Sequence, residues 1–318
     1  YESEIDEMEY AIKPMNCPGG MLMFSEGIHS YRELPLRWGE VGLVHRHELS
    51  GVLAGLFRVR SFHQDDAHIF MRPDQIKDEI LGVLNLVDEI YSTFGLSYHL
   101  ELSTRPDKSV GSDEAWETAT EGLRGALDST GKEYVINEGD GAFYGPKIDV
   151  HIKDAIGRTW QCGTIQLDMN LPERFDLKYI EKDGSEQRPV MIHRVIYGSM
   201  ERFLGILIEH YAGAFPVWLS PVQVHFVPVS DKHVEGAQKL AGEFESVGIR
   251  TEIDEADETV GNKIRKAAKS KAPYVVVVGD KELAGEDWQI RIHGQEEQES
   301  MSKDKFIERV LGEIEAKK

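Results

Sequence analysis

The chain has 318 residues, of which 41% are apolar, enough to bury the core of one large domain and of a smaller second one. Its net charge of −20 at pH 7 argues against an extensive nucleic-acid-binding surface, although an acidic protein can still carry a local basic site. Its two cysteines exclude a disulfide scaffold, and no apolar run approaches the ~20 residues of a membrane span, so we expect a cytoplasmic protein without a membrane partner.

The first patterned segment is Tyr10–Phe24, which contains the run M-N-C-P-G-G. The proline and two glycines disfavour regular structure, so we predict a short strand followed by a sharp turn that holds Cys17 in place. A lone cysteine is usually an ordinary buried side chain, but a stiff loop also suits a metal ligand. The residues alone leave both interpretations open.

A long antiparallel hairpin is predicted next, because the extended runs Gly42–Glu48 and Phe57–Phe70 flank the glycine-bearing connector Ser50–Gly55. Alternate side chains of a strand point to the same face. The second run therefore displays an aromatic ring, an amide, a carboxylate and an imidazole in a row: Phe62, Gln64, Asp66 and His68. Solvation does not require that assortment, so we interpret this face as a functional site. Charged side chains surround it at Arg46, Glu48, Arg58 and Arg60.

Two helices should cover the sheet to which this hairpin belongs. Residues Asp74–Gly95 carry an apolar stripe that predicts a helix, with Pro73 suited to its first turn. A second helix is expected to begin at the capping residue Ser112 and to reach Leu127. Further strand regions are expected at Tyr98–Thr104, Tyr134–Ile152, Thr159–Asp168 and Val190–Tyr197.

The run E-G-D-G-A-F-Y-G-P-K, which ends at Lys147, lets the backbone approach a ligand closely, with Tyr144 and Lys147 available for contact. A glycine-rich hairpin turn explains the run equally well. Further on, Gln161 and Gln166 lie an odd number of positions apart, so a regular strand would put them on opposite faces. A bulge at Gly163 would bring them to one face.

A helix is expected from Gly198 or Ser199 onward, with Arg202 in its first turn, where a cation opposes the helix dipole. An anion bound nearby would explain that arginine. The predicted buried side of this helix consists of Met200, Phe203, Leu204, Leu207 and Ile208.

Beyond the expected linker Trp218–Pro221, strands alternate with helices, which predicts parallel strands joined by crossover helices. The apolar run Val275–Val278 is typical of a central strand that is covered on both faces. We therefore predict an α+β domain over residues 1–217 and a smaller α/β domain over residues 218–318. The helices expected in the second domain are Val234–Val247, Val260–Lys271 and Lys303–Ala316.

Two constellations can be drawn from separate segments. The first is one thiol and two imidazoles, a set typical of a zinc site with an open fourth position: Cys17, His68 and His193. Most of the 12 histidines are expected to be ordinary, and no local ligand spacing singles out these two. The second could clamp a polyphosphate and its magnesium, and Phe62 could stack on a base. Its members are Arg46, Arg58, Arg202 and Glu48.

The chain closely resembles the threonyl-tRNA synthetase family in three linked motifs: M-N-C-P-G, R-H-E-L-S-G…R-V-R-S-F-H-Q-D-D-A-H-I-F and H-R-V-I-Y-G-S-M-E-R-F. The resemblance extends almost from Tyr10 to the end. Other class II synthetases share the arginines but not the Cys–His–His set. The resemblance implies a class II antiparallel sheet flanked by helices, followed by an anticodon-binding domain. It also implies that the first class II motif and the editing domain of the family precede Tyr1.

The activity that the resemblance implies is threonine–tRNA ligation, with threonine, ATP and tRNA(Thr) as partners. Threonine and ATP would give threonyl-adenylate, which would pass its threonyl group to the tRNA. The implied cofactors are one zinc ion per chain, which would bind the amino and hydroxyl groups of threonine, and magnesium with ATP. The full-length protein would be a homodimer.

The resemblance also implies a role for each matching residue. Zinc would be bound by Cys17, His68 and His193. Threonine would contact Met15, Asp66, Tyr144, Gln161 and Gln166. The catalytic arginines would be Arg46, on the α-phosphate and the threonine carboxylate, and Arg202. ATP would contact Arg46, Glu48, Arg58, Phe62, Gln64, Lys147, Thr164, Ser199 and Arg202. The anticodon would be read by Glu282 and Arg291.

Three positions depart from the family pattern: Gly20, where histidine is usual, His63, and the surroundings of Arg291, which are less basic than expected. A non-catalytic, synthetase-like RNA-binding or regulatory protein is therefore the alternative. A related class II synthetase for proline or serine would keep the arginines, but it has no need of the Cys–His–His set.

Overall fold

The computed structural model describes residues 2–318, which form two compact units that divide between Leu207 and Ile208. The division falls inside helix α5 (Met200–His210), whereas the boundary between residues 217 and 218 stays a prediction. Every helix within residues 2–318 is too short or too polar to span a lipid bilayer.

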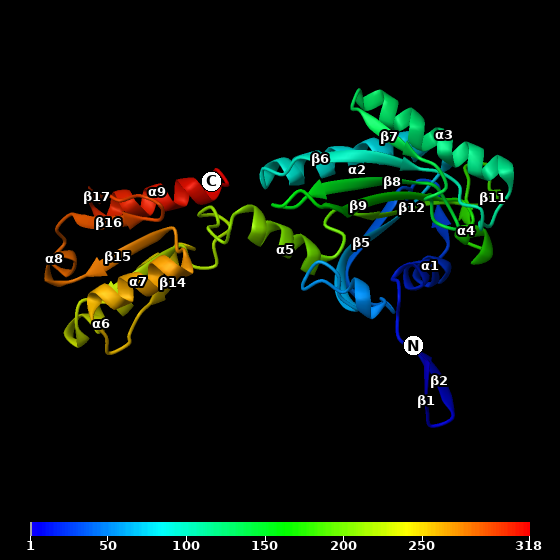
Figure 1. The fold of residues 1–318 in the computed structure, drawn as a ribbon. Helices are drawn as coiled ribbons and strands as arrows, with labels where there is room; N and C mark the ends of the chain where they lie inside the picture. Colours follow the sequence, from blue (N-terminus) through cyan, green and yellow to red (C-terminus); the bar gives the residue numbers. More distant parts are fainter. Residues whose placement is uncertain (1) are drawn as a thin grey trace. The chain divides into compact units, whose positions relative to one another are not determined.

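A seven-stranded sheet organises the first unit (Figure 1). Its strand order is β4-β5-β12-β9-β8-β6-β7, and only β6 and β7 run parallel to each other. The expected antiparallel sheet is thus confirmed. Its strands are β4 (Leu36–His45), β5 (Ser61–Met71), β6 (Tyr98–Ser103), β7 (Tyr134–Asn137), β8 (Lys147–Lys153), β9 (Thr159–Asp168) and β12 (Val190–Val195).

The predicted hairpin is confirmed as the pair β4 and β5, in register from Leu36 opposite Phe70 to His45 opposite Ser61. Its first strand begins earlier than expected, and its second begins later than Phe57. The connector between the two strands contains the short 3-10 helix η1 (Ser50–Val52).

Helices α2 (Ile76–Thr93) and α3 (Asp113–Thr130) cover one face of the sheet (Figure 1). The short 3-10 helix η2 (Pro73–Gln75) precedes α2. The predicted cap is confirmed, because the Ser112 hydroxyl accepts a hydrogen bond from the backbone N–H of Ala115 at 3.2 Å. Because apolar stripes of both helices are buried on this face, polar side chains are left for the opposite face of the sheet.

The turn expected around Cys17 is wrong, because Cys17 is the first residue of helix α1 (Cys17–Ser25). Pro18 fits the first helical turn, where no backbone donor is needed. Phe24 of this helix is buried and stacks on Phe70 of β5 with ring centroids 4.6 Å apart. Tertiary packing therefore stabilises a helix that its proline and glycines disfavour locally.

Strand β9 contains a bulge next to Gly163, the condition under which Gln161 and Gln166 were expected to share a face. Gly163 lies opposite Val150 and Gln161 lies opposite His151, so Cys162 is the extra residue. The bulge shifts the alternation by one position. The side chains of Gln161 and Gln166 therefore point to the same face.

The buried side predicted for α5 is partly wrong. Leu204 and Ile208 are 49% and 41% exposed, whereas Gly205 and Ile206 are buried. Gly205 lies against Phe57, whose ring would be 3.3 Å from an added Cβ, so the connector before β5 packs on this side of the helix. This docking turns the buried stripe away from the predicted positions.

Strand β2 (Met8–Ala11) overlaps the short strand predicted before Cys17, but it begins earlier, and it pairs with β1 (Glu2–Ile5) in an exposed hairpin. The other small elements of the first unit were not predicted. A second small sheet joins β3 (His29–Ser30), β10 (Tyr179–Ile180) and β11 (Glu186–Gln187). A single-turn helix, α4 (Leu171–Arg174), follows β9.

The second unit contains a five-stranded sheet of order β14-β13-β15-β16-β17. Strands β13 (Val224–Pro228), β14 (Thr251–Ile253) and β15 (Tyr274–Val278) are parallel, as predicted. Strands β16 (Trp288–Ile292) and β17 (Gln298–Met301) are antiparallel, which corrects the prediction of parallel strands throughout. The connection from β15 to β16 holds only the single-turn helix α8 (Asp280–Leu283), too short for the crossover that a parallel strand requires. The remaining helices are η3 (Asp231–His233), α6 (Val234–Ser246), α7 (Val260–Ser270) and α9 (Lys303–Glu315).

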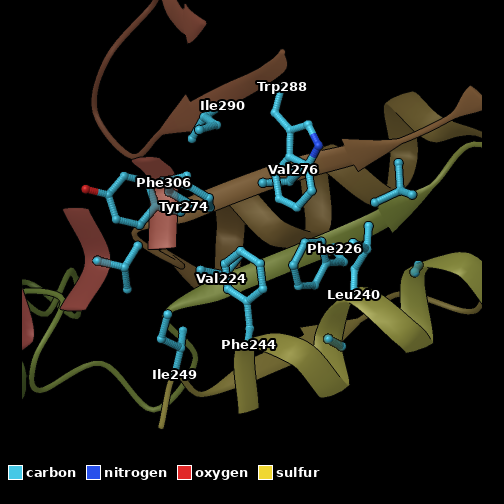
Figure 2. Close-up of a cluster of buried hydrophobic side chains, with 14 of the residues drawn as sticks. Val224, Phe226, Leu240, Phe244, Ile249, Tyr274, Val276, Trp288, Ile290 and Phe306 are labelled. Atoms are coloured by element: carbon cyan, nitrogen blue, oxygen red, sulfur yellow. The ribbon is translucent and has the colours of Figure 1, made fainter. Parts of the chain in front are cut away.

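Four aromatic side chains from strands and helices form the centre of this unit's core (Figure 2). Phe244 of α6 stacks on Trp288 of β16 with ring centroids 5.8 Å apart, and it meets Phe226 of β13 edge-on at 5.3 Å. Phe306 of α9 closes the group. Because all four are buried, the unit has a hydrophobic core of its own.

We expect Phe244→Ala to destabilise the second unit by about 3–5 kcal/mol, because it removes a buried ring and leaves a cavity between Phe226 and Trp288. Urea unfolding of the full chain, followed by Trp fluorescence, measures the change. The control is Val247→Ala, which truncates a 45% exposed side chain and should change stability by less than about 0.5 kcal/mol. Equal effects of the two substitutions would contradict the assignment of this core.

Candidate active site

The centre of the polar sheet face is fixed by strand pairing. His68 of β5 lies directly opposite His193 of β12, and His193 lies opposite Gln166 of β9. The imidazole rings of the two histidines are 5.2 Å apart and nearly perpendicular. Residues that are distant in sequence are thus brought side by side.

Helix α1 adds Cys17 to this pair of histidines. One ligand atom from each of Cys17, His68 and His193 lies within 4.8 Å of the others, and all three residues are buried. In the described part of the chain, His68 Nε2 is buried without a hydrogen-bond partner. Burial lowers the pKa of His68 to about 4, so its imidazole is neutral at pH 7 and keeps a lone pair for a ligand.

This donor set fits a zinc ion, which takes thiolate and neutral imidazole ligands. His193 Nε2 lies 2.9 Å from Asp168 Oδ2, so the carboxylate orients the ring and leaves Nδ1 available to a ligand. His68 Nε2, which has no hydrogen-bond partner in the described part of the chain, is likewise available to bind a metal ion. Gly20 is close to the cluster, since a Cβ there would be 3.6 Å from His68 Nδ1.

Asp66 lies beside the cluster on the same strand face as His68. The Asn16 amide Nδ2 donates a hydrogen bond to Asp66 Oδ2 at 3.0 Å. Asp66 Oδ1 lies 3.7 Å from His68 Nε2 and remains available to a ligand. Gly42 leaves room for this amide, because a Cβ there would lie 2.5 Å from it and would displace it.

A first cavity of about 260 Å³ opens over these residues. Across it, the Tyr144 hydroxyl donates a hydrogen bond to Gln166 Oε1 at 2.7 Å. The cavity brings together most of the predicted threonine-binding residues, but not Gln161. The site residues that line it are Met15, Cys17, Arg46, Gln64, Asp66, Tyr144, Lys147, Thr164, Gln166 and His193.

A second cavity of about 260 Å³ adjoins the first, and the two share Arg46, Gln64 and Thr164. It holds three arginines, so it is locally basic in a strongly acidic chain. The guanidinium of Arg46 lies 5.4 Å from the centre of the Phe62 ring. The predicted residues that line this cavity are Arg46, Glu48, Arg58, Phe62, Gln64, Gln161, Thr164, Ser199 and Arg202.

Arg202 lies in the first turn of α5, and two backbone carbonyls outside that helix hold its guanidinium in place. Its Nε donates to the carbonyl of Phe57 at 2.7 Å, and its Nη1 donates to the carbonyl of Gln161 at 2.6 Å. The guanidinium also lies 5.3 Å from the ring of Trp160. Burial lowers the pKa of Arg202, but an arginine stays protonated in proteins. The cation is therefore fixed and poorly solvated, as an anion-binding group should be.

Sequence reasoning missed Asp149, which supports the residues between the cavities. The buried carboxylate accepts hydrogen bonds from Lys147 Nζ at 2.6 Å, Gln161 Nε2 at 2.5 Å and Thr164 Oγ1 at 3.1 Å. Its signal in the sequence was its place two residues after Lys147 on an alternating strand. One buried charge thus orients three side chains of the site.

Sequence reasoning also missed Asp65, which holds the turn before α5. Its carboxylate accepts hydrogen bonds from the backbone N–H groups of Ile196, Tyr197 and Gly198 at 2.7, 3.1 and 3.0 Å. Gly198 has φ 74°, and a Cβ there would lie 2.3 Å from the carbonyl oxygen of Cys162, so only glycine fits. The pair of adjacent aspartates in the motif was the available signal, since neighbours on a strand face opposite ways.

The two residues predicted to read the anticodon lie in the second unit. Glu282 Oε2 accepts a hydrogen bond from the backbone N–H of Gly279 at 2.9 Å, at the start of α8. Arg291 lies on β16, opposite Val275 of β15 and Gln298 of β17. Their roles stay predictions.

Comparison with protein families gives two matches that together cover most of the chain. Residues 1–211 match the tRNA synthetase class II core domain (G, H, P, S and T). Residues 223–313 match the anticodon binding domain.

Individual relatives share high identity with the chain. It is 66% identical over 291 residues to the threonine–tRNA ligase of Desulfosudis oleivorans, covering 92% of this chain and 46% of that protein. It is 59% identical over 318 residues to the threonine–tRNA ligase of Carboxydothermus hydrogenoformans, covering 100% of this chain and 50% of that protein. The chain therefore spans about half the length of the curated relatives it matches.

A solved structure is also similar to the chain. It is the RNA binding domain of threonyl-tRNA synthetase from Cryptosporidium parvum Iowa II, with a TM-score of 0.92 and 42% sequence identity. The match covers 98% of this chain and 79% of that one.

We expect Cys162 to resist thiol reagents in the folded chain. Burial raises the pKa of its thiol from 9.0 to about 12, so below pH 9 its thiolate fraction is on the order of a thousandfold lower than that of an ordinary cysteine. The Cys17→Ala variant leaves Cys162 as the only thiol, and its reaction with Ellman's reagent at pH 8 measures the effect. Labelling should become fast in urea; fast labelling of the folded variant would contradict the burial of this thiol.

Proposed function

The chain belongs to the threonyl-tRNA synthetases, a family of class II synthetases, and on that premise we propose that it is a threonine–tRNA ligase. It activates L-threonine with ATP and transfers the threonyl group to tRNA(Thr). One observation carries the proposal: a cavity lined by the Cys17 thiol and the His193 imidazole, with His68 beside them, adjoins a cavity with three arginines. A metal-binding amino-acid pocket beside a polyphosphate pocket is what this reaction needs.

The arginines would hold the nucleotide. Arg46 lines both cavities, so it can contact the α-phosphate and the threonine carboxylate together. Arg58 and Arg202 would bind the γ-phosphate of a bent ATP, with magnesium on the phosphates, and Phe62 would stack on adenine. Glu48 would accept from the adenine amino group.

The first step joins a threonine carboxylate oxygen to the α-phosphorus while the bond to pyrophosphate breaks. In the second step a terminal ribose hydroxyl of the tRNA attacks the threonyl carbonyl, and AMP leaves. The protein forms no covalent bond in either step. Its contribution is to align the reactants and to stabilise negative charge with fixed arginines.

We propose that Cys17, His68 and His193 bind one zinc ion per chain. When bound, the ion supplies a Lewis acid that grips the amino and hydroxyl groups of threonine. Asp66 Oδ1 faces the same space and accepts a hydrogen bond from either group. Valine lacks the hydroxyl and would leave these polar groups unpaired, whereas serine keeps both groups and should enter.

The remaining residues refine this picture. Gln161 is held by Asp149 in the nucleotide cavity, which supports contact with the adenylate from that side. Met15 and Tyr144 both line the threonine cavity. Anticodon reading by Glu282 and Arg291, a homodimer of the full-length protein and a cytoplasmic location stay predictions.

We expect the chain to exchange pyrophosphate into ATP when threonine is present. Arg202→Ala should lower kcat/KM for this exchange roughly 10²–10³-fold, because a fixed positive charge on the polyphosphate is lost. The matched control is Arg188→Ala, since Arg188 is an exposed arginine paired with Glu173 and Asp176 and should be dispensable.

The same assay separates the alternatives. Serine should support exchange and valine should not. If the folded chain catalyses no pyrophosphate exchange with any amino acid, the non-catalytic RNA-binding protein is favoured. Exchange that depends on proline would indicate a different synthetase.

Metal analysis tests the zinc site without an activity readout. The wild-type chain should carry one zinc ion bound by Cys17, and Cys17→Ala should lose it because the thiolate is the softest of the three ligands. Cys162→Ala is the control, since this second buried cysteine lies outside the cluster and its loss should leave the zinc in place. Equal zinc content in the two variants would exclude Cys17 as a ligand.

A further inference from the structure

A second group of metal-ligating side chains lies on the polar face of the same sheet. It consists of His99 and Glu101 on β6 and His151 on β8, and one ligand atom from each lies within 4.8 Å of the others. The two strands are antiparallel neighbours (Figure 1), and His99 lies directly opposite His151. Glu101 is two residues from His99, so its side chain shares their face. The threonine–tRNA ligase reaction uses none of the three.

The two imidazoles face the carboxylate of Glu101. His99 Nε2 lies 3.3 Å from Glu101 Oε1, and His151 Nε2 lies 3.6 Å from Glu101 Oε2. The two rings are nearly parallel, 16° apart in plane, with centroids 5.0 Å apart. Both imidazoles therefore present the same ring nitrogen to the carboxylate.

The three residues are close enough for one cation to draw their ligand atoms together. Zinc bonds of about 2.0–2.2 Å to nitrogen and oxygen place neighbouring ligand atoms about 3.4 Å apart. The two imidazole nitrogens now face different oxygens of Glu101, and one ligand atom of each residue lies within 4.8 Å of the others. A bound cation would replace these contacts and bring the three ligand atoms closer to one another.

We propose that His99, Glu101 and His151 bind a divalent cation of the zinc class, with the fourth position open to water. Two imidazoles and a carboxylate are ligands that zinc accepts. The side chains are 40%, 21% and 16% exposed for His99, Glu101 and His151, so the cation has a path from solvent. The Asn137 amide Nδ2 donates to Glu101 Oε2 at 3.3 Å and orients the carboxylate.

The bound cation would join β6 to β8. Strand β8 also carries Lys147 and Asp149, which support the two cavities. The unfolded chain cannot assemble ligands from two strands, so the cation binds the folded state and raises the melting temperature. The site thus stabilises the part of the sheet that positions Asp149, and it does not depend on the proposed ligase activity.

Cobalt(II) spectroscopy on the full chain distinguishes this site from the cluster at Cys17. Cobalt bound by Cys17 gives a thiolate-to-metal charge-transfer band, whereas cobalt bound by two histidines and a glutamate gives only ligand-field bands. We expect Cys17→Ala to lose the charge-transfer band and to retain one equivalent of bound cobalt. Adding His99→Gln to that variant should remove the retained equivalent.

Zinc titration by equilibrium dialysis, with thermal melting, provides the second measurement. His99→Gln should lose one equivalent of zinc and the zinc-dependent rise in melting temperature, while His293→Gln, on an exposed residue outside the group, should lose neither. Glu101→Gln, of nearly equal shape, should repeat the loss and covers the case in which His99→Gln fails to fold.

Two results would overturn the proposal: no cobalt or zinc bound by Cys17→Ala, or unchanged metal content in folded His99→Gln and Glu101→Gln. Absence of the charge-transfer band from the cobalt(II) spectrum of the wild-type chain would instead count against the zinc site at Cys17. The two sites therefore fail separately.

Discussion

The antiparallel pairing of β5 with β12 places His68 opposite His193, and the candidate active site depends on that register. A slip of one residue would turn the whole polar row of β5 toward the helices α2 and α3. The apolar side chains on the other face prevent the slip, because Ile69 and Ile192 are buried opposite each other. Burial on one face thus fixes the chemistry on the other.

Buried and half-buried carboxylates position the functional groups on this framework. Asp168 orients His193, Asp65 holds the turn before α5, and Asp149 gathers Lys147 and the polar side chains of β9. Asp65 and Asp149 each accept three or more hydrogen bonds from neighbouring backbone or side-chain donors. The chain as a whole is strongly acidic, but three arginines gathered at the second cavity make that cavity locally basic.

The predictions that failed have two causes, packing between segments and the length of a connection. Helix α1 forms around Cys17 despite its proline and glycines because Phe24 packs on Phe70. Strand β16 is antiparallel because its connection is too short for a crossover, and α5 buries Gly205 because the connector before β5 docks there. Local pattern describes the preference of a segment, whereas its final state depends on what packs against it.

The sequence by itself determined the strands of the hairpin, the long helices and the family, because periodicity, capping and linked motifs are local properties, whereas the bulge on β9 was only one possibility until the strand register was known. Only the tertiary structure brought Cys17 to the two histidines, revealed Asp65 and Asp149 as supports, and assembled His99, Glu101 and His151. Strand pairing and helix docking create these groups from segments far apart in the chain, and no spacing within one segment encodes them.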